Sequence, residues 1–138
     1  MTKKLEIYID GASKGNPGPS GIGVVICKDG QTIKNISGFI GNATNNIAEY
    51  TALIYALQEA LMMRADSIVI NTDSQLLSRQ LNKEYRIRNL NLLGLYHQIQ
   101  HLLSGFKEVR VNNIQRQDNK GADKLANKAI KEALKKAL

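Results

Sequence analysis

The stretch "SIVINTD", residues 67–73, constrains the fold of this 138-residue chain more than any other segment. It is short and almost wholly apolar before its final aspartate, which is typical of a strand buried on both faces of a sheet. Amphipathic patterns at residues 46–63 and 122–138 predict helices that could cover such faces. The sequence therefore predicts an α/β protein with a mixed sheet flanked by helices.

The first part of the chain has the pattern of antiparallel strands. Apolar residues alternate with polar ones up to Ile9, which predicts a strand that ends at Asp10. Residues 21–41 form two β-rich runs joined at Asp29-Gly30, a strong hairpin signal. Helices are also expected at residues 74–82 and 90–103, and a further strand at residues 108–114. We expect one domain over residues 1–138.

The balance of charge indicates an anionic partner. The formal net charge is +7, and lysines gather in residues 124–136 and basic residues in 83–88. Nucleic acid is the commonest partner of such a domain, although solubility alone also explains the charge. The single cysteine, Cys27, excludes an intramolecular disulfide, and no run approaches the ~20 apolar residues of a membrane span. We expect a cytoplasmic protein with no membrane partner.

Four acidic residues stand where the predicted elements begin or end. Asp10 and Asp73 close two apolar strands, whereas Glu49 and Asp123 are expected in the first turns of helices. Each has a purely structural explanation, because Asp10 suits a turn and Glu49 could complete a capping box with Asn46. Asp73 could likewise cap the next helix, and Asp123 could complement a helix dipole.

Taken together, these four positions suggest a common site. If the first strand and the 67–73 strand are parallel neighbours, all four carboxylates could converge beyond the strand ends. Each like-charge pair ~4 Å apart costs about 4 kcal/mol at an effective dielectric of about 20, so such a cluster needs cations. A ligand set of carboxylates without histidine suits Mg²⁺ or Mn²⁺, and paired ions are a standard device for phosphodiester hydrolysis.

Four blocks of sequence resemble those of the type 1 ribonuclease H family, in its order and at its spacing: "YIDGASKGNPGPSGIGVVI", "TNNIAEYTALIYAL", "INTDSQLL" and "RQDNKGADKLANKA". The resemblance implies a ribonuclease H-like fold, with a five-stranded mixed sheet of three antiparallel strands followed by two parallel ones. It also implies endonucleolytic hydrolysis of the RNA strand of RNA/DNA hybrids by two metal ions, leaving 5′-phosphate and 3′-hydroxyl ends.

The same resemblance assigns roles to individual residues. It implies that Asp10, Glu49, Asp73 and Asp123 are the catalytic metal ligands, with Asp10 between the two ions, Mg²⁺ or Mn²⁺. Short amide side chains can both donate to and accept from a 2′-hydroxyl, and a glycine lets backbone approach a sugar-phosphate strand. The implied substrate contacts are Gly11, Asn16, Thr44, Asn45, Asn46 and Gln75.

Two departures from the family pattern matter. Many members have a histidine in the loop before the last aspartate, where this chain has Arg116, as in a branch of the family that uses arginine. We expect Arg116 to assist catalysis or product release, although guanidinium is a poor proton shuttle. The extended basic insertion that some members use to grip DNA is also absent. Lys83, Arg86 and Arg88 remain as a smaller basic surface, here called the reduced handle, which predicts salt-sensitive binding.

Two other functions remain open at this level. The first is a binding module for RNA/DNA hybrid or double-stranded RNA with little catalysis, which the complete carboxylate set argues against. The second is an enzyme of the same fold that acts on DNA, such as a transposase or exonuclease, which the "TNN" and "GNPG" blocks disfavour. The expected partner is an RNA/DNA hybrid, with double-stranded RNA as a further candidate, and the expected oligomeric state is a monomer.

Overall fold

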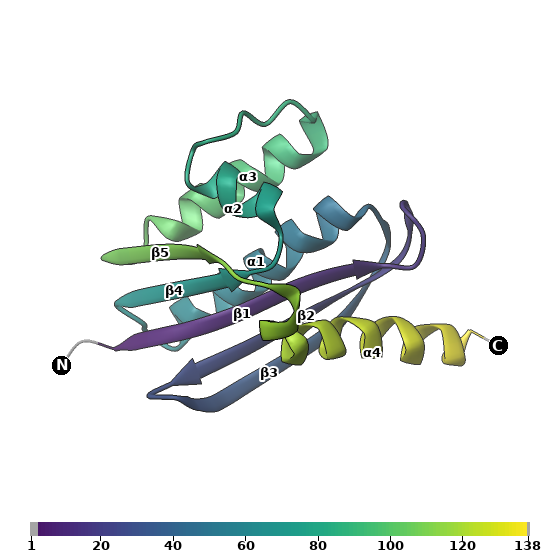
Figure 1. The fold of residues 1–138 in the computed structure, drawn as a ribbon, viewed down its shortest axis with the longest axis horizontal. Helices are drawn as coiled ribbons and strands as arrows, with labels where there is room; N and C mark the ends of the chain where they lie inside the picture. The colour runs from purple at the N-terminus through teal and green to yellow at the C-terminus, as the bar shows by residue number, and fades with distance from the viewer. Residues whose placement is uncertain (1–2, 138) are drawn as a thin grey trace.

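A five-stranded sheet in the order β3-β2-β1-β4-β5 forms the centre of the computed structural model (Figure 1). The structure describes residues 3–137, so residues 1–2 and 138, which the predicted domain and last helix include, lie outside it. Strand β1 pairs antiparallel with β2 and parallel with β4. The sheet thus has the predicted three antiparallel strands followed by two parallel ones. The strands are β1 (Lys4–Ser13), β2 (Gly18–Lys28), β3 (Gln31–Ala43), β4 (Ser67–Thr72) and β5 (Glu108–Asn113).

Helices cover both faces of this sheet. Helix α1 packs on β1 and β2 from one side and also contacts α3, whereas α4 packs on β1, β2 and β3 from the other side (Figure 1). The main core lies under α1, where the alternating residues Leu5, Ile7 and Ile9 of β1 are fully buried. The helices are α1 (Asn45–Met62), α2 (Gln75–Leu81), α3 (Leu90–Leu103) and α4 (Lys120–Lys136), with a short 3-10 helix, η1 (Arg116–Asp118).

Glycines in β1 and β2 let the helices approach the sheet at backbone distance, as Gly11 and Gly23 show. A Cβ atom on Gly11 would lie 2.3 Å from the backbone carbon of Ala48 in α1. On the opposite face, a Cβ atom on Gly23 would lie 2.0 Å from the backbone oxygen of Ala122 in α4. Because real Cβ atoms do not come this close to backbone, both contacts require glycine.

Strand β1 does not end at Asp10 as the sequence predicted. It continues to Ser13, because residues 11–13 pair with residues 20–22 of β2. The turn therefore falls at residues 14–17, and Asp10 lies inside a strand. The predicted hairpin at Asp29-Gly30 is confirmed, since both residues have positive φ angles and connect the antiparallel strands β2 and β3. Across residues 3–137, none of the helices combines the length and the apolar character that crossing a membrane requires.

Candidate active site

The four acidic residues predicted from the sequence line one pocket of about 460 Å³. Asp10 is in β1 and Asp73 directly follows β4, and these two strands are parallel neighbours with Ile9 paired to Thr72. The convergence expected from that pairing is therefore confirmed. The pocket is lined by Asp10, Gly11, Ala12, Ser13, Asn45, Glu49, Asp73, Arg116, Asp123 and Asn127.

Three of the four carboxylates form a tight cluster. Single carboxylate oxygens of Asp10, Glu49 and Asp73 all lie within 4.8 Å of one another. Asp123 reaches the same pocket from the first turn of α4, outside that cluster, and its Oδ1 accepts a hydrogen bond of 3.2 Å from the Asn127 amide. The arrangement therefore consists of a three-carboxylate core with a fourth carboxylate at its side.

Burial makes this cluster electrostatically unfavourable without added cations. It raises the pKa of Asp10 from 3.8 to about 7, with the charge of Asp73 as the next cause. Burial, followed by the charges of Asp10 and Asp73, also raises the pKa of Glu49 well above its usual value. Within the described part of the chain, the buried Glu49 Oε2 has no hydrogen-bond partner. A set of oxygen donors that includes an unpaired buried oxygen fits a hard divalent cation.

Neither Glu49 nor Asp73 has the capping role that each could have had. Thr44 is the N-cap of α1, because it has extended backbone after β3 and its side chain accepts from the Ile47 amide. The capping box with Asn46 is therefore wrong. Since α1 begins at Asn45, Glu49 lies in the second turn and not in the first as predicted. Ser74, not Asp73, caps α2.

The six predicted substrate contacts separate into two groups. Gly11 and Asn45 line the acidic pocket, whereas Asn16, Thr44, Asn46 and Gln75 lie outside its lining. The Asn16 side chain accepts a 3.0 Å hydrogen bond from the Asn45 amide and so ties the hairpin turn to the start of α1. The side chains of Asn46 and Gln75 are exposed at the starts of α1 and α2.

Among residues 3–137, Arg116 is the only basic residue that lines the acidic pocket. Its guanidinium lies 3.9 Å from the Asp123 carboxylate, and its side chain is 84% exposed. This position, at the rim and next to a proposed metal ligand, agrees with the loop placement expected from the sequence.

Sequence reasoning missed three residues that shape the pocket. Ser13 and Asn127 line it directly, and the signal for Asn127 was its position four residues after Asp123 on the same helix. Asn119 is buried, and its amide donates a 2.8 Å hydrogen bond to the Ile9 carbonyl, next to Asp10. This bond fixes the start of α4 against β1, and no spacing in the sequence pointed to it.

Comparisons with known proteins agree with the geometry. The family described as Reverse transcriptase-like matches residues 8–129. Ribonuclease HI of Halobacterium salinarum is 39% identical over 131 residues, which are 94% of this chain and 66% of that protein. A bifunctional protein of Mycobacterium tuberculosis is 39% identical over 97% of this chain and 37% of its own length. The chain thus spans less than two thirds of these curated relatives.

Solved structures give the same assignment. The N-terminal RNase H domain of that mycobacterial protein, solved as a fusion with maltose-binding protein, has a TM-score of 0.95 and 36% identity, covering 99% of this chain and 100% of that one. LC11-RNase H1 in complex with an RNA/DNA hybrid has a TM-score of 0.89 and 39% identity, covering 94% and 99%. The chain therefore belongs to the reverse transcriptase-like family, and its sequence and fold group it with the ribonucleases H.

Proposed function

We propose that this chain is an endoribonuclease that hydrolyses the RNA strand of RNA/DNA hybrids, leaving 5′-phosphate and 3′-hydroxyl ends. The observation that carries the proposal is the convergence of the Asp10, Glu49 and Asp73 carboxylates, with Asp123 in the same pocket. The similarity to a ribonuclease HI and to a ribonuclease H1 solved with a hybrid supports it.

The carboxylates of Asp10, Glu49, Asp73 and Asp123 would hold two divalent cations, Mg²⁺ or Mn²⁺. Bound ions of this kind supply an activated water and stabilise the charge on the leaving oxygen. The protein holds the first three carboxylates together through the parallel pairing of β1 with β4 and the close packing of α1 on Gly11. Their position is thus fixed before substrate arrives.

Neutral and basic groups beside the carboxylates would meet the nucleic acid. Ser13, Asn45 and Asn127 line the pocket with a hydroxyl and two amides, which hydrogen-bond to phosphate or ribose without adding negative charge. The Arg116 guanidinium at the rim would stabilise the charge of the reacting phosphate. Since guanidinium stays protonated at neutral pH, Arg116 would not carry the proton of the attacking water.

Selectivity for RNA would come from the polar side chains outside the pocket. We assign contacts with the backbone and minor groove of the hybrid to Asn16, Thr44, Asn45 and Asn46, and a further minor-groove contact to Gln75. Gly11 would let the protein backbone approach a sugar-phosphate strand. Amide groups can recognise the 2′-hydroxyl in that groove, which distinguishes a ribonucleotide strand from DNA. The hydrogen bond between Asn16 and the Asn45 amide would hold two of these contacts in register.

A panel of substrates and metals tests the proposal. We expect purified protein to cut the RNA strand of an end-labelled hybrid with Mg²⁺ or Mn²⁺ and not with EDTA, and to leave duplex DNA of the same sequence intact. Double-stranded RNA in the same panel tests the further partner. Binding of the hybrid without cutting under any metal would instead identify a binding module, and preferential cutting of DNA would identify a DNA nuclease.

The monomeric state, the single domain over residues 1–138 and the cytoplasmic location stay predictions. Light scattering at two protein concentrations tests the first of these, and limited proteolysis tests the second.

A further inference from the structure

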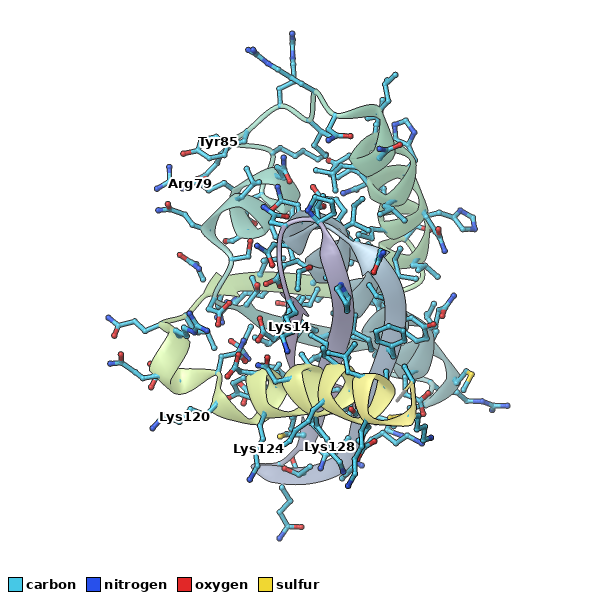
Figure 2. All side chains as sticks on the ribbon, turned by 90° about the vertical axis from the view of Figure 1, so that its right-hand side faces the viewer. Lys14, Arg79, Tyr85, Lys120, Lys124 and Lys128 are labelled. Atoms are coloured by element: carbon cyan, nitrogen blue, oxygen red, sulfur yellow. The ribbon has the colours of Figure 1, made fainter. Side chains whose placement is uncertain are left out.

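Five lysines of α4 form one exposed face, here called the α4 lysine face: Lys120, Lys124, Lys128, Lys131 and Lys135. At 3.6 residues per turn they lie within an arc of about 80°, which begins about 60° around the helix from Asp123. Figure 2 shows Lys120, Lys124 and Lys128 along this side of α4, with Lys14 above the helix on the β1–β2 hairpin.

Most of this positive charge has no acidic partner in the described part of the chain. Lys128 is 4.0 Å from Glu132, and both side chains are 60% exposed. The other four lysines make no ion pair within residues 3–137, and Asp123 and Glu132 are the acidic residues of α4 on either side of them. An isolated exposed pair contributes little, so the face is a concentrated and nearly uncompensated patch of positive charge.

A second pocket joins this face to the acidic site. It has a volume of about 500 Å³ and is lined by Lys14 and Lys131 together with Ile130 and Leu134. Ser13 and Asn127 line this pocket as well as the acidic one. The hollow surface therefore continues from the carboxylates, past these two residues, to lysines on both of its sides.

The chemistry of the face favours one class of partner. None of the large apolar side chains exposed in the described residues is on α4, so the face lacks the aromatic and aliphatic groups of a protein interface or of a membrane-inserted helix. The row from Lys120 to Lys135 is about 22 Å long at 1.5 Å per residue. That length matches about six phosphates at 3.4 Å per nucleotide along one strand.

We propose that Lys14 and the α4 lysine face hold the phosphate backbone of a nucleic-acid duplex that extends beyond the acidic pocket. This inference rests on the proposed function for the identity of the duplex as an RNA/DNA hybrid. The face is separate from the reduced handle at Lys83, Arg86 and Arg88, which lies in the segment between α2 and α3, so the chain grips its substrate with α4 as well as with that segment.

The test compares two charge-matched triple variants by metal-free hybrid binding in EDTA, in which no strand is cut. The first is Lys124→Gln/Lys128→Gln/Lys131→Gln. The control is Lys4→Gln/Lys28→Gln/Lys107→Gln, whose exposed lysines lie at the strand ends away from the acidic pocket. Affinity is measured against salt for a hybrid of about 20 base pairs and for one of about 8, which is too short to occupy both the pocket and the face.

We expect the α4 triple to bind the long hybrid at least about tenfold more weakly than wild type and to lower the salt slope by about 2, since each phosphate contact contributes about 0.7–0.9. The ratio of the affinities for the long and the short hybrid should also be lower in the α4 triple than in wild type. The control triple should keep the wild-type slope and ratio.

Equal losses in both triples would overturn the proposal, because net charge and not a local surface would then explain binding. Unchanged hybrid binding by the α4 triple, with loss of binding to phosphatidylserine vesicles, would overturn it in favour of a lipid headgroup. Failure of the nuclease proposal would be seen separately, as absence of cutting in the substrate panel.

Discussion

Asp123 and Lys124 are neighbours on α4, yet they belong to two different charged surfaces. One is a pocket of clustered carboxylates, and the other is a row of exposed lysines. The acidic pocket buries Asp10 and Glu49 close to the partly buried Asp73, and burial raises the pKa of Asp10 to about 7. The α4 lysine face is exposed to water, where charges are hydrated and screened by salt. Charge in the pocket therefore affects the stability of the fold and the binding of cations. Charge on the α4 lysine face has little effect on stability and is available to bind a partner.

The largest expected effect comes from removing one charge in the pocket. Asp73→Asn keeps the shape of the side chain but loses an anionic ligand, so the rate of hybrid cleavage should fall at least about a thousandfold. Removal of a single oxyanion-hole donor lowers kcat by about 10²–10³, and the loss of a metal ligand should cost as much or more. Initial rates on a labelled hybrid measure this. Asp118→Asn, an exposed acid in η1 outside the pocket, is the matched control and should stay close to wild type.

A change beneath α4 should disturb both surfaces at once. Gly23→Ala places a methyl group 2.0 Å from the Ala122 carbonyl oxygen, so α4 must shift, at a cost of about 3 kcal/mol or more in the free energy of unfolding. Urea denaturation measures the loss. In Gly38→Ala the new methyl group would meet only the Ile22 side chain at 3.5 Å, and this control should lose far less. Equal stability of the two variants would refute the backbone contact.

The pH dependence of stability should separate the pocket from the face. In metal-free protein the raised pKa of Asp10 means that the native state holds its proton more tightly than the unfolded state. That contribution is complete below about pH 4 and is lost as the pH rises towards 7, so wild type should lose stability across this window. Asp10→Asn should avoid the part of the loss that comes from Asp10 and exceed wild type in stability by about 2 kcal/mol at pH 8. This is less than the shift of Asp10 gives at about 1.4 kcal/mol per pKa unit, because the neighbouring carboxyls share the shift.

Urea denaturation in EDTA at several pH values measures this difference. The two proteins should be alike near pH 4. Wild type that gains stability relative to Asp10→Asn between pH 4 and 7 would contradict the raised pKa.

The smallest effect is expected at Arg116, which lies at the rim of the acidic pocket. Arg116→Ala should lower kcat about tenfold, or about 1.4 kcal/mol, while Arg116→Lys keeps most activity because the charge remains. Thermal unfolding should be unchanged within about 0.5 kcal/mol, since the ion pair with Asp123 is exposed. If Arg116→Lys is as slow as Arg116→Ala, the planar guanidinium and not its charge is what matters.

Much of the fold could be predicted because a few segments permit little else. The apolar 67–73 run required a covered central strand, and Asp29-Gly30 fixed a hairpin. The end of β1 could not be predicted from such local signals. Glycine and proline after Asp10 indicate a turn, but pairing of residues 11–13 with β2 extends the strand through those signals.

All four acidic residues of the site could be predicted from the sequence, whereas the burial of Glu49 and the cap of its helix could not. Asp10 and Asp73 follow from the parallel pairing of two apolar strands. The burial of Glu49 depends on how closely α1 lies on Gly11, which no periodicity reveals. The cap at Thr44 was missed because Asn46 and Glu49 have the spacing of a capping box, and the second pocket joins a hairpin to a helix more than a hundred residues away.

The contacts at Gly11 and Gly23 have a consequence for how the active centre could evolve. No layer of side chains separates α1 or α4 from the sheet at these points. The direct contact between main chains therefore sets how far the acidic residues of the helices lie from those of the strands. Exchanging core side chains elsewhere would leave this spacing between helix and sheet unchanged. The centre can thus tolerate drift in most of the interior while remaining intolerant of a single added methyl group at either glycine.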